Sequence, residues 1–218
     1  MTFTYTLTCT LDTTTALPPV AGSEEQRAYW VTPTILAWPL SLLPRGMDRE
    51  VVVTDAGDPL PGSGLALRLI TAPDGGAAAV HGQILGADGM PAPTLTPLRI
   101  VGNLPGEVLA AHPHLEGYIA LSATDAAGTP LLDDHAVASA LTGQVAIAQY
   151  VGVPDPTEAA DVSGAHLDAF TGVQTAILLD HLYAEAATRA ELGVTFTGGL
   201  PSFALWAPTA QAVTLLTW

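Results

Sequence analysis

The sequence predicts a mainly β protein, an antiparallel immunoglobulin-like β-sandwich with one or two short helices. Three observations lead to this prediction. Short apolar runs recur along the chain, at residues 28–38, 51–54, 65–71, 98–101, 118–123 and 145–151. Turn segments rich in Asp and Gly separate several of them, at residues 55–58, 74–76, 86–89 and 125–128. Residues 3–11 alternate apolar side chains with threonine, which is the period of two of a strand with one buried face.

The first 26 residues are expected to form an N-terminal strand and a linker. After the alternating strand, residues 12–25 are rich in Thr, Pro and small side chains and contain Pro18 and Pro19. A sandwich domain is then expected over residues 27–191. Its first apolar run is expected to break at Pro33, because proline cannot donate a hydrogen bond within a sheet.

Three stretches favour helix. Residues 105–112 and 134–141 carry Ala, Val and Leu and predict one or two helical turns each between strands. Residues 183–190 are rich in alanine, with Glu185 and Arg189 four residues apart, which favours a brief helix before Gly193. Residues 194–197 and 202–206 then predict the opening strands of a second domain, with the boundary near residue 192.

The charge balance excludes two classes of partner. The chain of 218 residues has 21 acidic side chains against six arginines and no lysine, a net charge of −15. Such a charge repels nucleic acid and anionic membrane surfaces. A neutral ligand such as a glucan meets no such repulsion. No uninterrupted apolar run approaches the ~20 residues needed to span a bilayer.

The N-terminus and the single cysteine leave the cellular compartment undetermined. Cys9 has no second cysteine with which to form an internal disulfide. No secretory signal is visible after Met1, so a cytoplasmic protein is expected if Met1 is the native start. If it is not, secretion stays open.

No catalytic residue is expected within this chain. A glycosidase needs two carboxyls that flank the scissile bond, and no pair stands out among acidic residues that lie mostly in turn segments. The sequence contains neither a Gly-x-Ser-x-Gly nucleophile elbow nor a phosphate-binding loop, and Cys9 has no histidine in its strand.

Two histidine-containing clusters are candidate metal ligands. His112 and His114 flank Pro113, and His135 follows the carboxylates of Asp133 and Asp134. Zinc needs three or four converging ligands, and no spacing brings these clusters together. We therefore expect no metal site and no cofactor, with residues 112–114 forming a loop from which His114 or Leu115 packs inward.

Tryptophans are the candidate sugar-binding residues. A pyranose ring stacks on an exposed aromatic face, and Trp30 and Trp38 would share a strand face if the strand were unbroken. Core packing is the favoured interpretation of both, and glucan stacking is the alternative. Trp206 is expected in a core.

Residues 203–213, with the segment Trp-Ala-Pro-Thr-Ala at 206–210, resemble the first strand of a carbohydrate-binding family 48 module of glycoside hydrolase family 13. Residues 27–31 (Arg-Ala-Tyr-Trp-Val) with 37–39 (Ala-Trp-Pro) resemble the domain that precedes this module in bacterial pullulanases and plant limit dextrinases. Residues 112–118 and 173–183 are similar to later segments of that domain, although His181 stands where the family usually has Asp.

The resemblance implies a non-catalytic N-terminal part of a debranching enzyme, with residues 192–218 as the first strands of an incomplete family 48 module. The parent enzyme would hydrolyse α-1,6 linkages in pullulan, limit dextrin or glycogen on a catalytic barrel beyond Trp218. Its partners would be branched α-glucan and that barrel. The alternatives are a free-standing glucan-binding module and a purely structural one.

Overall fold

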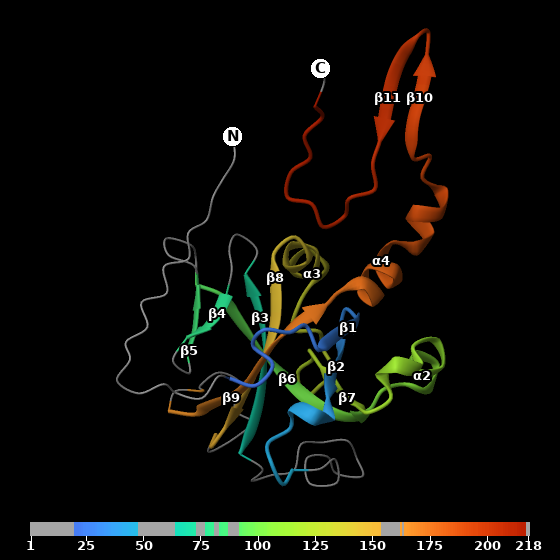
Figure 1. Cartoon of the computed structure of the whole chain (residues 1–218). Coiled ribbons are helices and arrows are strands. Elements are labelled where there is room, and N and C mark those ends of the chain that lie inside the picture. Colours follow the sequence, from blue (N-terminus) through green and yellow to red (C-terminus); the bar gives the residue numbers. More distant parts are fainter. Residues whose placement is uncertain are drawn as a thin grey trace.

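The structure is a computed structural model, and it describes residues 20–47, 64–72, 77–80, 83–86, 92–153, 162 and 164–216. The strands expected at residues 3–11 and 51–54 lie outside the described residues, as do Cys9, the turns expected at 55–58 and 74–76, and most of the turn expected at 86–89. The elements follow one another along the chain as shown in Figure 1. They are β1 (Ala28–Thr32), β2 (Ile35–Pro39), η1 (Leu40–Leu42), β3 (Leu65–Ala72), β4 (Ala77–Val80), β5 (Gln83–Gly86), β6 (Thr94–Asn103), α2 (Gly106–Ala111), η2 (Pro113–Leu115), β7 (Tyr118–Ser122), α3 (Asp134–Leu141), β8 (Gln144–Val151), β9 (His166–Gln174), α4 (Ala176–Arg189), β10 (Gly193–Thr197) and β11 (Leu200–Ala204).

Seven strands form one closed sheet. Their order is β1-β2-β7-β6-β3-β8-β9, and β9 returns to β1. The closing pair is parallel, with Ala28 opposite Val173 and Tyr29 opposite Gln174, whereas the other pairs in this sheet are antiparallel. Three register shifts, within the β1–β2, β6–β7 and β8–β9 pairs, bend the strands as closure requires.

This closed sheet corrects part of the predicted fold class. The mainly β content is confirmed, but the strand pairing does not divide into the two separate sheets of an immunoglobulin-like sandwich. Alternation of buried and exposed side chains is the same in a sandwich and a barrel, because both have one inner and one outer face. The pairing of β1 with β9, two strands far apart in the sequence, is what distinguishes a barrel from a sandwich here.

The main core fills the inside of the closed sheet. Large side chains that are almost completely buried meet there from most of the strands, including Trp30, Leu36, Trp38, Leu67, Leu69, Ile119, Leu121 and Ile147. Each fully buried Leu or Ile contributes about 1.5–3 kcal/mol of transfer free energy relative to an exposed one. The interior is therefore a packed core.

Two further apolar clusters cover parts of the outer face of the sheet. One includes Ile70, Tyr150, Leu167 and Phe170 on β3, β8 and β9. The other places Leu104 and Leu115, from the segment around α2 and η2, against Val31, Ala37 and Ala120, with Ile177 of α4 beside them. Strands β3 and β8 are consequently buried on both faces for most of their length, which explains their continuous apolar sequence.

The short helices lie where the sequence predicts them, and the last helix is longer than predicted. Helices α2 and α3 occupy the two predicted stretches, and Asp133 caps α3 by accepting a 2.7 Å hydrogen bond from Ala136 N. Helix α4 has 14 residues and begins at Ala176, seven residues before the expected start. No helix in the described part of the chain is long and apolar enough to cross a membrane.

The C-terminal strands form a hairpin that extends away from the barrel (Figure 1). Its turn, Gly198-Gly199, has positive φ angles of 60° and 83°, as a two-residue hairpin turn requires. The predicted strand pair is thus confirmed, with β11 ending at Ala204. Trp206 follows the hairpin and is 38% exposed, so the prediction that it lies in a core is wrong. Its ring meets that of Tyr183 on α4 edge to face, with the ring centroids 5.9 Å apart.

Candidate functional site

Both tryptophans proposed as sugar-stacking residues lie in the main core. Trp30 and Trp38 are 0% exposed, so neither indole offers a ring face to a ligand. This corrects the stacking alternative and supports the interpretation that they pack in the core. The physical reason is the break at Pro33, which folds β1 and β2 back on each other and turns both rings into the barrel.

A buried glutamine, Gln149, supplies the hydrogen-bond acceptor for the Trp38 indole, a role that was not predicted. The indole Nε1 donates to Gln149 Oε1 at 3.1 Å, and Gln149 Nε2 donates to the backbone oxygen of Leu42 at 2.7 Å and to Asp168 Oδ2 at 2.8 Å. The Trp30 Nε1 atom is buried without a hydrogen-bond partner. A glutamine in an otherwise apolar strand was the one signal that pointed to this network.

The two histidine-containing clusters remain apart. Asp133 serves as the cap of α3, whereas His112 and His114 flank the start of η2 with ring centroids 5.9 Å apart. Within the described ranges, no three side chains of the types that bind metals come together. The sequence predicted that His114 or Leu115 packs inward from this loop. Leu115 is the one that does, with 0% exposure.

His114 instead joins an aromatic cluster on the outer face of the sheet. Its ring lies 5.3 Å from that of Tyr29, which in turn meets Tyr118 edge to face at 5.7 Å. Burial raises the pKa of Tyr118 and Tyr29 adds to that shift, while Arg27 opposes it. These residues come from β1, the start of η2 and β7, so the cluster connects three segments.

The aromatic cluster adjoins the line along which the sheet closes, here called the seam. Tyr29 is the register partner of Gln174 in the parallel β1–β9 pair. Residues 20–27, the N-terminal strap, run beside β9: Ala21 O accepts from Phe170 N and Glu25 O from Gly172 N, both at 2.9 Å. The segments 27–31, 112–118 and 173–174, distant in the sequence, therefore meet at one place.

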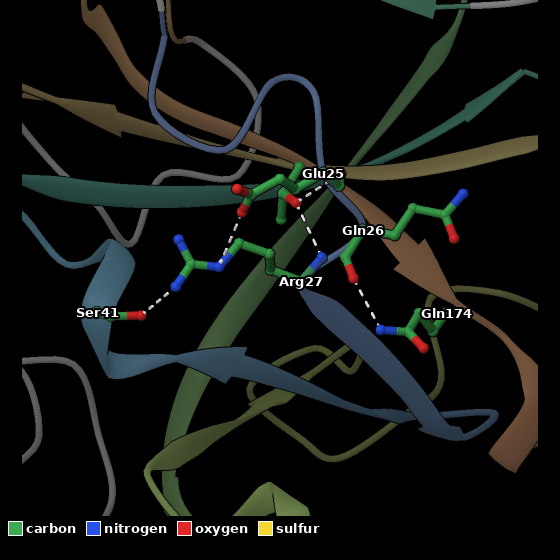
Figure 2. A network of polar contacts seen from close by, with 6 residues as sticks. Glu25, Gln26, Arg27, Ser41 and Gln174 are labelled. Atoms are coloured by element: carbon green, nitrogen blue, oxygen red, sulfur yellow. Dashed lines mark hydrogen bonds and ion pairs between the residues drawn. The ribbon is translucent and has the colours of Figure 1, made fainter.

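Polar contacts hold the strap at the seam, as Figure 2 shows. Arg27 forms an ion pair with Glu25 at 3.2 Å and donates to Ser41 Oγ at 2.7 Å. Gln174 Nε2 donates to the backbone oxygen of Gln26 at 2.7 Å. The buried Thr171 hydroxyl accepts from Arg27 N at 3.0 Å and donates to Glu25 O at 2.9 Å. The role of Thr171 was not predicted, because its partners lie more than 140 positions away.

The fold and the seam define a class of protein: a β-rich module whose recognisable sequence segments meet where the closed sheet is joined. The chain belongs to the pullulanase N2 domain family, whose model matches residues 25–181. The match begins within the strap and ends within α4, so it contains both sides of the seam.

Solved structures of pullulanases resemble this chain. Ligand-free PulA from Klebsiella pneumoniae is 26% identical with a TM-score of 0.55, and the alignment covers 88% of this chain and 14% of that one. An apo pullulanase from the same organism (26%, TM-score 0.52) and a complex with maltotriose (26%, TM-score 0.52) match over 88% of this chain and 15% and 14% of theirs. The chain thus spans about one seventh of the length of these structures. A comparison with curated protein sequences finds no match.

Proposed function

We propose that this chain is the non-catalytic N-terminal part of a debranching enzyme. The parent hydrolyses α-1,6-glucosidic linkages in pullulan, limit dextrin or glycogen. The observation that carries the proposal is the family match over residues 25–181, supported by the similarity to pullulanase structures over 88% of the chain. The catalytic carboxylates belong to a barrel outside this chain.

Within that enzyme, the barrel-like domain at residues 27–191 packs beside the catalytic barrel, and residues 192–218 are the opening strands of a family 48 module. The contrast in burial between the two parts supports this division. Residues 28–178 contain the apolar core, whereas Phe196, Leu200 and Leu205 are at least 70% exposed. Residues 1–26 precede the domain, and residues 20–26 of this segment form most of the strap.

The test compares two forms of the enzyme encoded by the extended reading frame of the source genome. One contains residues 1–218 and the following barrel, and the other starts at residue 192. We expect both forms to release reducing ends from pullulan, and the shorter one to unfold at a lower temperature because it lacks the packed domain. If the extended frame encodes no protein that cleaves pullulan, limit dextrin or glycogen, the proposal is wrong.

A further inference from the structure

An open cleft of about 430 Å³ lies beside the seam, at the end of the barrel where β9 finishes and β8 begins. The strap supplies one wall through Gln26, and the turn between α3 and β8 supplies another through Gly143 and Gln144. Gln174 and Thr175 close it where the chain passes from β9 into α4. Its volume falls within the range of about 300–1,000 Å³ typical of small-molecule sites.

The chemistry of the lining is neutral and rich in amides. None of the residues that line the cleft is charged, although the chain carries a net charge of −15. Three carboxamides, those of Gln26, Gln144 and Gln174, present both donors and acceptors. Sugar hydroxyls are themselves both donors and acceptors, so they match this lining. A charged ligand finds no counter-charge here, and a hydrocarbon finds few apolar partners apart from Leu141 and two valines.

One of these amides is held in place, and two neighbouring polar groups lie next to it. Gln174 Nε2 is anchored by the backbone oxygen of Gln26, and the rest of its amide has no hydrogen-bond partner among the described residues. Figure 2 shows this contact, with the Gln26 side chain extending away from Arg27. A Cβ atom at Gly172 would lie 2.8 Å from Gln26 Cγ, so the glycine lets the Gln26 side chain lie against β9. Thr175 is the N-cap of α4, but its hydroxyl makes no capping hydrogen bond.

We propose that this cleft binds a neutral polyhydroxyl ligand, a glucosyl unit of an α-glucan, through the amides of Gln26 and Gln174 and the hydroxyl of Thr175. The choice of α-glucan among neutral polyols rests on the proposed function. The contacts that closure of the barrel requires use the backbone oxygen of Gln26 and one N–H of Gln174, so the remaining polar groups stay available for the ligand.

The experiment titrates the 218-residue chain with maltotriose and follows the side-chain amide resonances by NMR. Glutamine resonances of the cleft are expected to shift in a saturable manner. Gln174→Ala is expected to weaken binding by about 10-fold, since each lost hydrogen bond contributes roughly 0.5–1.5 kcal/mol. Thr175→Val, which keeps the side-chain shape, is expected to weaken it by about 3-fold without a change in thermal midpoint. Asn103→Ala removes an exposed amide outside the cleft and is the matched control.

Three outcomes overturn the inference: no saturable shift, equal affinity in the wild type and both cleft variants, or equal weakening by Asn103→Ala. Glucose 6-phosphate is the charged control and is expected to bind more weakly than glucose, because the lining offers no cation. The result is separable from the proposed function. If the extended enzyme cleaves pullulan while the chain shows no maltotriose shifts, only the cleft assignment fails. If maltotriose binds but no debranching parent exists, the proposed function fails and the cleft assignment stands.

Discussion

Trp38 on β2 and Gln149 on β8 are joined by a 3.1 Å hydrogen bond across the inside of the barrel, and both side chains are completely buried. These strands are not neighbours in the sheet, so the contact spans the core rather than a strand pair. It is a polar link between two walls of a mostly apolar interior.

Replacing Gln149 by leucine is expected to destabilise the domain by about 3 kcal/mol. The substitution leaves the Trp38 N–H and the Leu42 carbonyl without their buried partner, at roughly 1–3 kcal/mol for each such group. Urea unfolding followed by circular dichroism measures the loss. A Trp38→Phe, Gln149→Leu double variant is the control. Its loss should be smaller than the sum of the single losses by about 1 kcal/mol, and strict additivity would show that the bond contributes nothing.

Thr171→Val tests the seam. Valine keeps the shape of threonine but leaves Arg27 N without its acceptor and Glu25 O with only its bond from Gly172 N, so we expect a loss of about 2 kcal/mol in unfolding free energy. The matched control is Thr188→Val on the exposed face of α4, where the change should stay within about 0.5 kcal/mol. Equal effects at the two positions would mean that the strap does not depend on this hydroxyl.

Arg68 is a buried cation whose removal is expected to be harmless or favourable. Its side chain is 2% exposed and Nη2 has no hydrogen-bond partner, while burial lowers its pKa. Because a buried charge without full pairing is costly, Arg68→Met should leave the unfolding free energy unchanged or raise it by about 1 kcal/mol. Arg68→Ala, which adds a cavity, should destabilise by comparison. A loss of several kcal/mol in Arg68→Met would reveal a favourable role for the guanidinium.

The Asp125 turn predicts a specific pH dependence. Asp125 Oδ1 accepts hydrogen bonds from Thr129 N at 2.8 Å and from Ala127 N at 2.9 Å, and these bonds, that of Thr129 above all, hold its pKa below the ordinary value of 3.8. A depressed folded-state pKa contributes stability above the unfolded-state value, and that contribution disappears as the pH falls through the folded-state pKa. The stability difference between wild type and Asp125→Ala should therefore shrink below about pH 3.8.

Thermal unfolding between neutral and strongly acidic pH measures that difference. Asp125→Asn is the control, since it keeps an acceptor oxygen but does not ionise. A difference between wild type and Asp125→Ala that stays constant down to the most acidic pH would show that ionisation of Asp125 plays no part.

Removal of residues 192–218 is expected to reduce self-association. Leu192, Val194, Phe196, Leu200 and Phe203 are all more than half exposed on the hairpin and its approach, and exposed apolar strands favour association. Dynamic light scattering before and after truncation measures the effect. The barrel should keep its thermal midpoint, because α4 ends at Arg189. Aggregation that is unchanged by the truncation would show that another surface mediates self-association.

Several local features of the fold could be predicted because their causes lie within a few residues. Helices α2 and α3 follow from short apolar stretches with helix-compatible residues, and β10 and β11 follow from two apolar runs around Gly198 and Gly199. Strand β9 and the first half of α4 were not predicted. In β9, Gly172 and polar residues interrupt the apolar pattern, because this strand pairs with the strap as well as with β8.

The candidate site likewise has one part that could be predicted from the sequence and one that could not. The sequence segments at residues 27–31, 112–118 and 173–183 were enough to indicate the family, since each is a local string of residues. Their common location at the seam could not be predicted, because no local pattern states that Tyr29 lies opposite Gln174 or against His114. Core packing of Trp30 and Trp38 was the favoured expectation and is confirmed, but the closed sheet that surrounds them could not be predicted.

The sequence by itself determined the mainly β class, the short helices, the acidic surface and the relationship to the pullulanase N2 domain. These depend on composition and on periodicity within short segments. The tertiary structure alone decided that the sheet closes, that the tryptophans point into the barrel and that an uncharged amide-lined cleft lies beside the seam. Each of these depends on contacts between residues more than 100 positions apart, whose free energy is gained only when the whole chain has folded.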